Sequence, residues 1–173
     1  MNTFIPTDNI FDCPKYLDKR RCFKQLLESY QILNILDGKS TGYKNHPVIR
    51  MYEDNRDFLQ WYYNIFYEYC VNVHMINIKK LPPPSLLPQM MIYPIWWGYY
   101  PLHKSHLQNL KRKSIEEYEK HNTTNLANIL ISQIYGNYDN LEWKNIPYIW
   151  PVDKDGYLIQ EIREWYFKLA LEK

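Results

Sequence analysis

The stretch that most constrains the fold is residues 12–38, "DCPKYLDKRRCFKQLLESYQILNILDG". Asp12 is a residue type that caps helices, Pro14 suits a first helical turn, and Gly38 is a common stop signal. Apolar residues recur between them at intervals of three and four, the spacing of one helix face. An isolated helix is marginal in water, so other elements must cover this face. The apolar positions are Leu17, Phe23, Leu26, Leu27, Tyr30, Leu33, Ile35 and Leu36.

Helical spacing returns in three later segments. It predicts a very aromatic helix within residues 47–72, a third over 103–121 and a last one over 156–172. Residues 81–101 contain many prolines and predict an ordered loop, because proline removes a hydrogen-bond donor and disfavours helix before it. Residues 122–135 can form a short fourth helix or belong to an insertion, and we expect an insertion around 122–145. With no strand pattern or repeat, the sequence predicts an all-α fold.

The length of 173 residues fits one compact domain that spans the whole chain. The net charge is only +2, so the overall field gives no strong case for a polyanionic partner. Cations nevertheless gather in residues 15–24 and in residues 111–113, and such local clusters are typical of nucleic-acid binding. We therefore weigh a nucleic acid as a partner.

The three cysteines show no CxxC pairing, and Cys22 is interpreted as structural although cations surround it. No charged and apolar leader is present, and no apolar run approaches a membrane span. We expect a reduced, soluble, intracellular monomer without a cofactor and without contact to a membrane.

His103 and His106 lie one helical turn apart beside Arg112 and Lys113. One interpretation is a metal site, with His46 or His74 as a third ligand, but the sequence specifies no further ligands. A second is that the imidazoles donate hydrogen bonds to phosphates, and a third is an ordinary solvated helix. The sequence favours phosphate contacts and no metal.

Glu28 is a carboxylate on the same predicted helix as Lys24, four residues earlier. An exposed ion pair at this spacing contributes only about 0.3 to 0.5 kcal/mol. The other interpretation is a carboxylate that handles protons or stabilises a cationic sugar intermediate. Both stay open.

Aromatic residues cluster in two loops, one around Trp96 and Trp97 and one around Tyr148 and Trp150. Packing in the core is the commoner explanation. The alternative is a lining for a distorted or flipped base, since aromatic faces stack on any base.

Five segments in this order resemble the pyrimidine-dimer DNA glycosylases of phages and bacteria, the endonuclease V family. They are "MNTFIP", "LDKRRCFKQLLESYQIL", "GYKNHPVIRMY", "LHKSHLQNLKRK" and "PYIWP". The resemblance implies a compact helical fold, a DNA glycosylase activity coupled to AP-lyase strand cutting, and damaged or modified duplex DNA as substrate. It also implies that no metal takes part.

The resemblance assigns roles to individual residues. An N-terminal α-amine attacks the sugar, and it is the amine of Asn2 if Met1 is removed and that of Met1 otherwise; Glu28 assists. The alternative is a nucleic-acid-binding module without catalysis on the same scaffold, and a third is an enzyme for another modified base. The candidate DNA contacts are Lys19, Arg20, Arg21, Lys24, Gln25, His46, His103, His106, Asn109, Arg112, Lys113 and Trp150.

Overall fold

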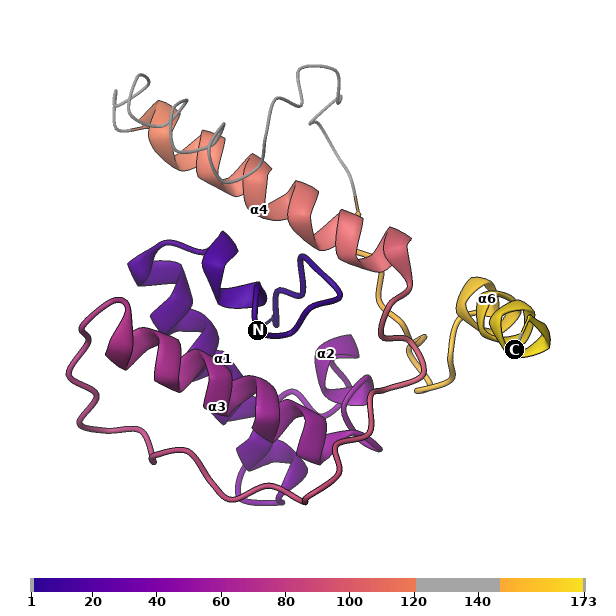
Figure 1. The fold of residues 1–173 in the computed structure, drawn as a ribbon, viewed down its shortest axis with the longest axis horizontal. Helices are drawn as coiled ribbons and strands as arrows, with labels where there is room; N and C mark the ends of the chain where they lie inside the picture. Colours follow the sequence, from indigo (N-terminus) through magenta and orange to yellow (C-terminus); the bar gives the residue numbers. More distant parts are fainter. Residues whose placement is uncertain (1, 121–146, 173) are drawn as a thin grey trace.

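The computed structural model describes residues 2–120 and 147–172, with side chains up to residue 113 in the first range (Figure 1). The expected insertion around 122–145 lies entirely outside these residues. The described part is helical, and its only β-type pairing is an isolated antiparallel bridge between Val152 and Leu158. The predicted all-α class is therefore confirmed. The elements are the 3-10 helix η1 (Cys13–Tyr16) and the α-helices α1 (Lys19–Leu36), α2 (Pro47–Arg50), α3 (Arg56–Asn72), α4 (Tyr100–Lys120) and α6 (Gln160–Leu171).

The first helix begins later than its sequence pattern predicts. Asp12 and Pro14 belong to the separate turn η1, and Leu17 is extended, with φ −120° and ψ 137°. Asp18 is the N-cap of α1, and its side chain accepts a hydrogen bond from the amide of Arg21 at 2.8 Å. Two capping signals six residues apart compete here, and the second one starts the long helix.

The predicted helix within residues 47–72 is two helices. The His46 side chain caps α2 by accepting a hydrogen bond from the amide of Val48 at 3.1 Å, and α2 ends after one turn. Residues 51–54 form turns before α3 begins. The last helix also starts late, at Gln160, because the preceding residues turn back at Gly156, where φ is +90°. The helical pattern marks which residues are buried but not where turns interrupt it.

Helices α1 and α3 pack against each other and form most of the core (Figure 1). Tyr62 and Phe66 of α3 are stacked with ring centroids 4.4 Å apart. The thiols of Cys22 and Cys70 meet between the two helices, with their sulfur atoms 3.5 Å apart. Trp96 is 2% exposed, so this member of the first loop cluster packs in the core.

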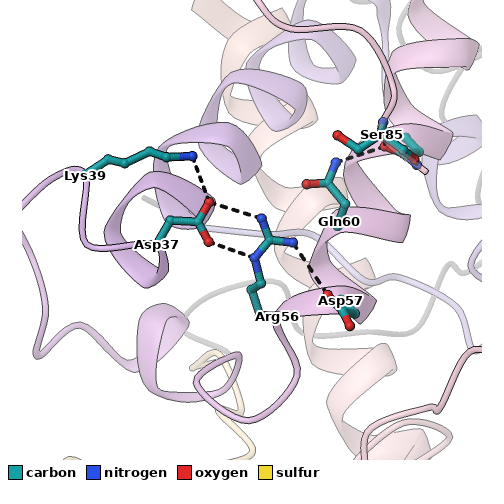
Figure 2. Close-up of polar contacts among 7 residues, drawn as sticks. Asp37, Lys39, Arg56, Asp57, Gln60 and Ser85 are labelled. Atoms are coloured by element: carbon teal, nitrogen blue, oxygen red, sulfur yellow. Dashed lines mark hydrogen bonds and ion pairs between the residues drawn. The ribbon is translucent and has the colours of Figure 1, made fainter. Parts of the chain in front are cut away.

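An ion-pair network ties the end of α1 to the start of α3 (Figure 2). Arg56 donates from Nε to one carboxylate oxygen of Asp37 at 2.7 Å and from Nη2 to the other at 3.1 Å. Lys39 adds a contact of 3.0 Å to the same carboxylate. On the next turns of α3, Asn64 holds the backbone of Ser85 in the proline-rich loop at 2.8 Å. The loop is therefore ordered, as its composition predicts.

Helix α4 lies across the start of the chain, and α6 lies to one side of the body (Figure 1). Trp165 of α6 packs against Tyr99 just before α4, with ring centroids 5.5 Å apart. None of the described helices is long and apolar enough to cross a membrane.

Candidate functional site

The start of the chain is held along α1 by two side chains one helical turn apart. The backbone nitrogen of Asn2 donates to Oε2 of Glu28 at 2.9 Å. The amide of Phe4 donates to Oε1 of Gln25 at 2.7 Å, and Nε2 of Gln25 donates to the carbonyl of Asn2 at 3.1 Å. The Glu28 side chain is only 14% exposed. Met1, the other candidate source of the nucleophilic amine, lies outside the described residues.

Two histidines of α4 hold the same segment from the other side. His103 Nδ1 donates to the carbonyl of Ile5 at 2.8 Å, and His106 Nδ1 accepts from the amide of Ile5 at 3.3 Å. His103 Nε2 in turn accepts from the amide of Gly98 at 3.1 Å, which fits a neutral ring. Burial lowers the pKa of both rings, that of His106 to about 3. Both are therefore neutral near pH 7.

The burial of His103 and His106 corrects the expectation that they contact phosphates. They are 4% and 0% exposed, and the Nδ1 atom of each ring bonds the backbone of Ile5 in the N-terminal segment. The spacing correctly put both rings on one face of α4, but that face is the buried one. In the part of the chain that the structure describes, no three histidine, cysteine or carboxylate side chains gather as a metal site, and His46 does not complete one.

Two further candidate DNA contacts are internal. Gln25 and Asn109 are each 2% exposed. Gln25 bonds the backbone of the N-terminal segment, and Asn109 donates to the carbonyl of Ser105 at 2.9 Å and accepts from Arg112 at 3.2 Å. The extended residues 2–5 have no helix or sheet partner for their backbone groups, so polar side chains in the protein interior must bond them. The sequence pattern gives no sign of this need. Gln25 is thus a positioning residue for the N-terminal segment, whereas Asn109 bonds two residues of its own helix.

The predicted cations of α1 lie at or near the surface around Glu28. Lys19 and Arg20 are exposed, and Lys24 is 70% exposed with its Nζ 3.7 Å from Oε1 of Glu28. Arg21 pairs with Asp18 and also donates to the carbonyl of Lys113 at 3.3 Å. Arg21 thereby joins the basic segment of α1 to that of α4.

Lys113 extends across the start of the chain. Its Nζ lies 5.2 Å from the ring centre of Phe4 and 5.7 Å from that of Tyr148, distances of cation–π contact. Burial, and next the charge of Arg112, lower the pKa of Lys113. The positive charges of α1 and α4 consequently converge beside Glu28.

Four neighbouring rings lie beside the charge of Lys113, and we call them the aromatic wall: His46, His106, Tyr148 and Trp150. The half-buried Trp150 has its ring centre 5.8 Å from His46, 6.0 Å from His106 and 5.9 Å from Tyr148. Burial raises the pKa of Tyr148 to about 12, so its phenol stays protonated. The wall is built partly into the core, and its role as a base lining stays a prediction.

Residues of α2, α3 and the turn between the two α-helices complete the site without having been singled out in the sequence. The hydroxyl of Tyr62 donates a hydrogen bond to the carbonyl of Phe4 at 2.9 Å. The hydroxyl oxygens of Thr3 and Tyr52 are 3.0 Å apart. Among so many tyrosines no local signal distinguishes these two. They anchor the extended segment that presents Asn2 to Glu28.

The fold and the site define a small helical protein. At its candidate site the largely buried carboxylate of Glu28 accepts a hydrogen bond from the backbone nitrogen of Asn2, and the cations of α1 and α4 lie nearby. Residues 1–72 match the family model described as pyrimidine dimer DNA glycosylase, so the family resemblance read from the sequence is confirmed over this segment. The segment contains Glu28, Gln25 and the cations of α1. Comparisons with curated proteins and with solved structures gave no significant match.

Proposed function

We propose that the protein is a DNA repair glycosylase with AP-lyase activity that acts on pyrimidine dimers or another damaged base in duplex DNA. The observation that carries the proposal is the contact of 2.9 Å between the backbone nitrogen of Asn2 and Oε2 of Glu28. If Met1 is removed, this nitrogen becomes a primary amine that is already beside a carboxylate. The match of residues 1–72 to the glycosylase family supports the same chemistry.

The amine suits the reaction because an α-amino group has an ordinary pKa of about 7.7 to 8.0 and is partly neutral near pH 7. Its lone pair forms a bond to C1′ of the sugar while the glycosidic bond breaks. The base leaves with the two electrons of the broken glycosidic bond and takes up a proton. Ring opening gives an imine, and loss of the C2′ proton then expels the 3′ phosphate.

Glu28 has two roles in this scheme. It orients the amine through the hydrogen bond to Asn2, and its negative charge stabilises the cationic imine. Because its side chain is only 14% exposed, water screens this charge weakly. If Met1 is retained, its own amine takes the place of the nucleophile, displaced by one residue.

The exposed cations hold the phosphates on both sides of the reacting sugar. Lys24 and Lys113 approach Glu28 from α1 and from α4, and Lys19 and Arg20 extend the positive surface along α1. Phosphate contacts fix the register of a protein on a duplex without reading its sequence, which suits an enzyme that searches for damage.

Borohydride trapping on duplex DNA with an abasic site or a pyrimidine dimer tests the proposal, because it reduces the imine to a stable covalent complex. We expect a trapped complex with the wild type and none after an N-terminal extension. Glu28→Gln should lower the rate of trapping by about 100-fold or more. Glu68→Gln is the matched control, since Glu68 is exposed on α3 and accepts a hydrogen bond from Asn72 of the same helix at 2.9 Å.

Intact-mass measurement of the native protein identifies which amine can act. Salt-dependent binding to the duplex without trapping or cleavage would favour the module without catalysis. Cleavage of a different lesion from a panel would keep the mechanism and change the substrate.

A further inference from the structure

The loop of residues 39–45 carries an exposed aromatic ring on a strained backbone. The backbone of Tyr43 has φ +60°, in the left-handed region that residues other than glycine and asparagine rarely adopt. Tyr43 is also 73% exposed. An exposed tyrosine that packs against little gives no stability in return for that conformation. Strain of this kind is often retained where it serves function.

Hydrogen bonds hold both ends of the loop, so the loop has a defined conformation in which the Tyr43 ring is exposed. At its start the amides of Lys39 and Ser40 donate to the carbonyl of Asn34 at 2.8 and 3.1 Å. At its end Arg50 Nη2 holds Oδ1 of Asn45 at 2.9 Å. Asp37, two residues before the loop, is clamped by Arg56 (Figure 2).

The loop ends at the candidate site. The amide of His46 donates to the carbonyl of Tyr43 at 2.9 Å, which closes a turn. His46 contacts Trp150 of the aromatic wall, with ring centroids 5.8 Å apart. The exposed Tyr43 and Lys44 therefore precede His46, a residue of the candidate site, by three and two positions.

Met75 is the other non-glycine residue with a positive φ among the described residues, and the end of a helix explains its conformation. Met75 has φ +52° and is 76% exposed, but it follows the end of α3. The amide of the next residue, Ile76, donates to the carbonyl of Cys70 at 3.0 Å. Left-handed residues are common where a helix ends in this way. Tyr43 has no helix end to explain its conformation, since Leu36 ends α1 seven residues earlier.

We propose that Tyr43 is a stacking residue that inserts its ring against a base beside the damaged nucleotide while Lys44 contacts the adjacent phosphate. The inference rests on the proposed function, because it needs a bound duplex. Aromatic rings stack on any base, and a rigid turn lowers the entropy lost when the ring is ordered. The strained loop thus takes part in opening the duplex at the lesion.

Three variants test the role. Tyr43→Asn removes the ring but suits φ +60°, so we expect an unchanged or higher melting temperature together with binding to lesion DNA weakened about fivefold or more, the loss of one stacked base. Tyr43→Phe should restore binding. Met75→Asn is the matched control, with the same backbone region and similar exposure, and it should leave binding unchanged.

Two readouts separate stacking from a general loss of fold. The fluorescence of 2-aminopurine next to the lesion should change on binding to the wild type and to Tyr43→Phe, but not to Tyr43→Asn. The salt dependence of binding should keep its slope in Tyr43→Asn, because no phosphate contact is lost.

Equal affinity and equal 2-aminopurine signals for Tyr43→Asn and the wild type would overturn the stacking role while the proposed function stands. A wild type that neither binds nor traps DNA would instead overturn the proposed function. A lower melting temperature for Tyr43→Asn would show that the ring supports the fold, and this too would contradict the inference.

Discussion

The side-chain oxygen of Gln25 lies 2.7 Å from the backbone nitrogen of Phe4, and this buried hydrogen bond fixes the start of the chain against α1. The amide nitrogen of Gln25 bonds the carbonyl of Asn2 at the same time. One internal side chain thus replaces the sheet partner that an extended segment normally has. The position of Asn2 relative to Glu28 depends on it.

Gln25→Leu keeps the approximate volume of the side chain and removes both hydrogen bonds to the N-terminal segment, together with those to Tyr62 at 3.0 Å and Glu28 at 3.4 Å. Because the Phe4 amide is buried, we expect the free energy of unfolding to fall by about 1 to 3 kcal/mol. Trapping on abasic DNA should fall further than stability alone explains, since Asn2 loses its alignment. Urea unfolding and single-turnover trapping measure the two effects. Gln31→Leu on the exposed face of α1 is the control, and equal losses in both variants would contradict the role of Gln25.

The ion pair between Asp37 and Arg56 should make stability depend on pH in the acid range. Arg56 lowers the pKa of Asp37 from 3.8 to about 2. The unfolded chain therefore binds the proton more readily, and the contribution of Asp37, complete above pH 4 to 5, is lost as the pH falls towards 2. In urea unfolding at pH 7, Asp37→Asn should cost about 1 kcal/mol and flatten this decline.

The control for that prediction is Asp57→Asn. Asp57 contacts the same Arg56 at 3.5 Å but is 61% exposed, so its loss should change the free energy of unfolding by less than about 0.5 kcal/mol. A decline with pH that is identical in Asp37→Asn and the wild type would show that the pair does not govern acid stability.

His106 should add a second pH dependence at higher pH. Burial holds its pKa at about 3 against an ordinary value near 6.5, so the native state favours the neutral ring. Its contribution is complete above pH 6.5 and declines as the pH falls from 6.5 towards 3. His106→Asn keeps an acceptor for Ile5 but removes the titration. Chemical unfolding between pH 4 and 7 should show a smaller slope for the variant, and an unchanged slope would count against a buried neutral His106.

Lys24 should contribute to DNA binding through phosphate and not through the fold. It is 70% exposed, and its ion pair with Glu28 at 3.7 Å is long. Lys24→Ala should weaken binding equally for all duplex sequences and lower the slope of log K against log salt by about 1. Lys154→Ala is the matched control, because Lys154 is 89% exposed, pairs with Asp155 at 4.0 Å and lies outside the basic segments of α1 and α4. Similar slopes for both variants would remove Lys24 from the DNA surface.

Much of the secondary structure could be predicted because it depends on local pattern. The apolar spacing identified α1, α3, α4 and α6, but α1 starts at Lys19 and not near Asp12, and α2 was not separated from α3. Helix α4 starts at Tyr100, three residues before its predicted start, and α6 starts at Gln160, four residues after its predicted start. Capping signals are short and occur more than once, so tertiary packing selects among them. The basic residues of α1 were placed correctly on its surface for the same local reason, since cations rarely stay inside unpaired.

The sequence by itself determined a helical chain with two basic segments and with His103 and His106 on one face of α4. Only the tertiary structure decided which face is buried. It turned both histidines and Gln25 from expected DNA contacts into supports of residues 2–5, and it buried Asn109 in a hydrogen bond to the carbonyl of Ser105. The reason is that an extended segment must find hydrogen-bond partners wherever the packed helices offer them. Periodicity describes one helix at a time, whereas the contact between Asn2 and Glu28 depends on how α1, α3 and α4 enclose the start of the chain.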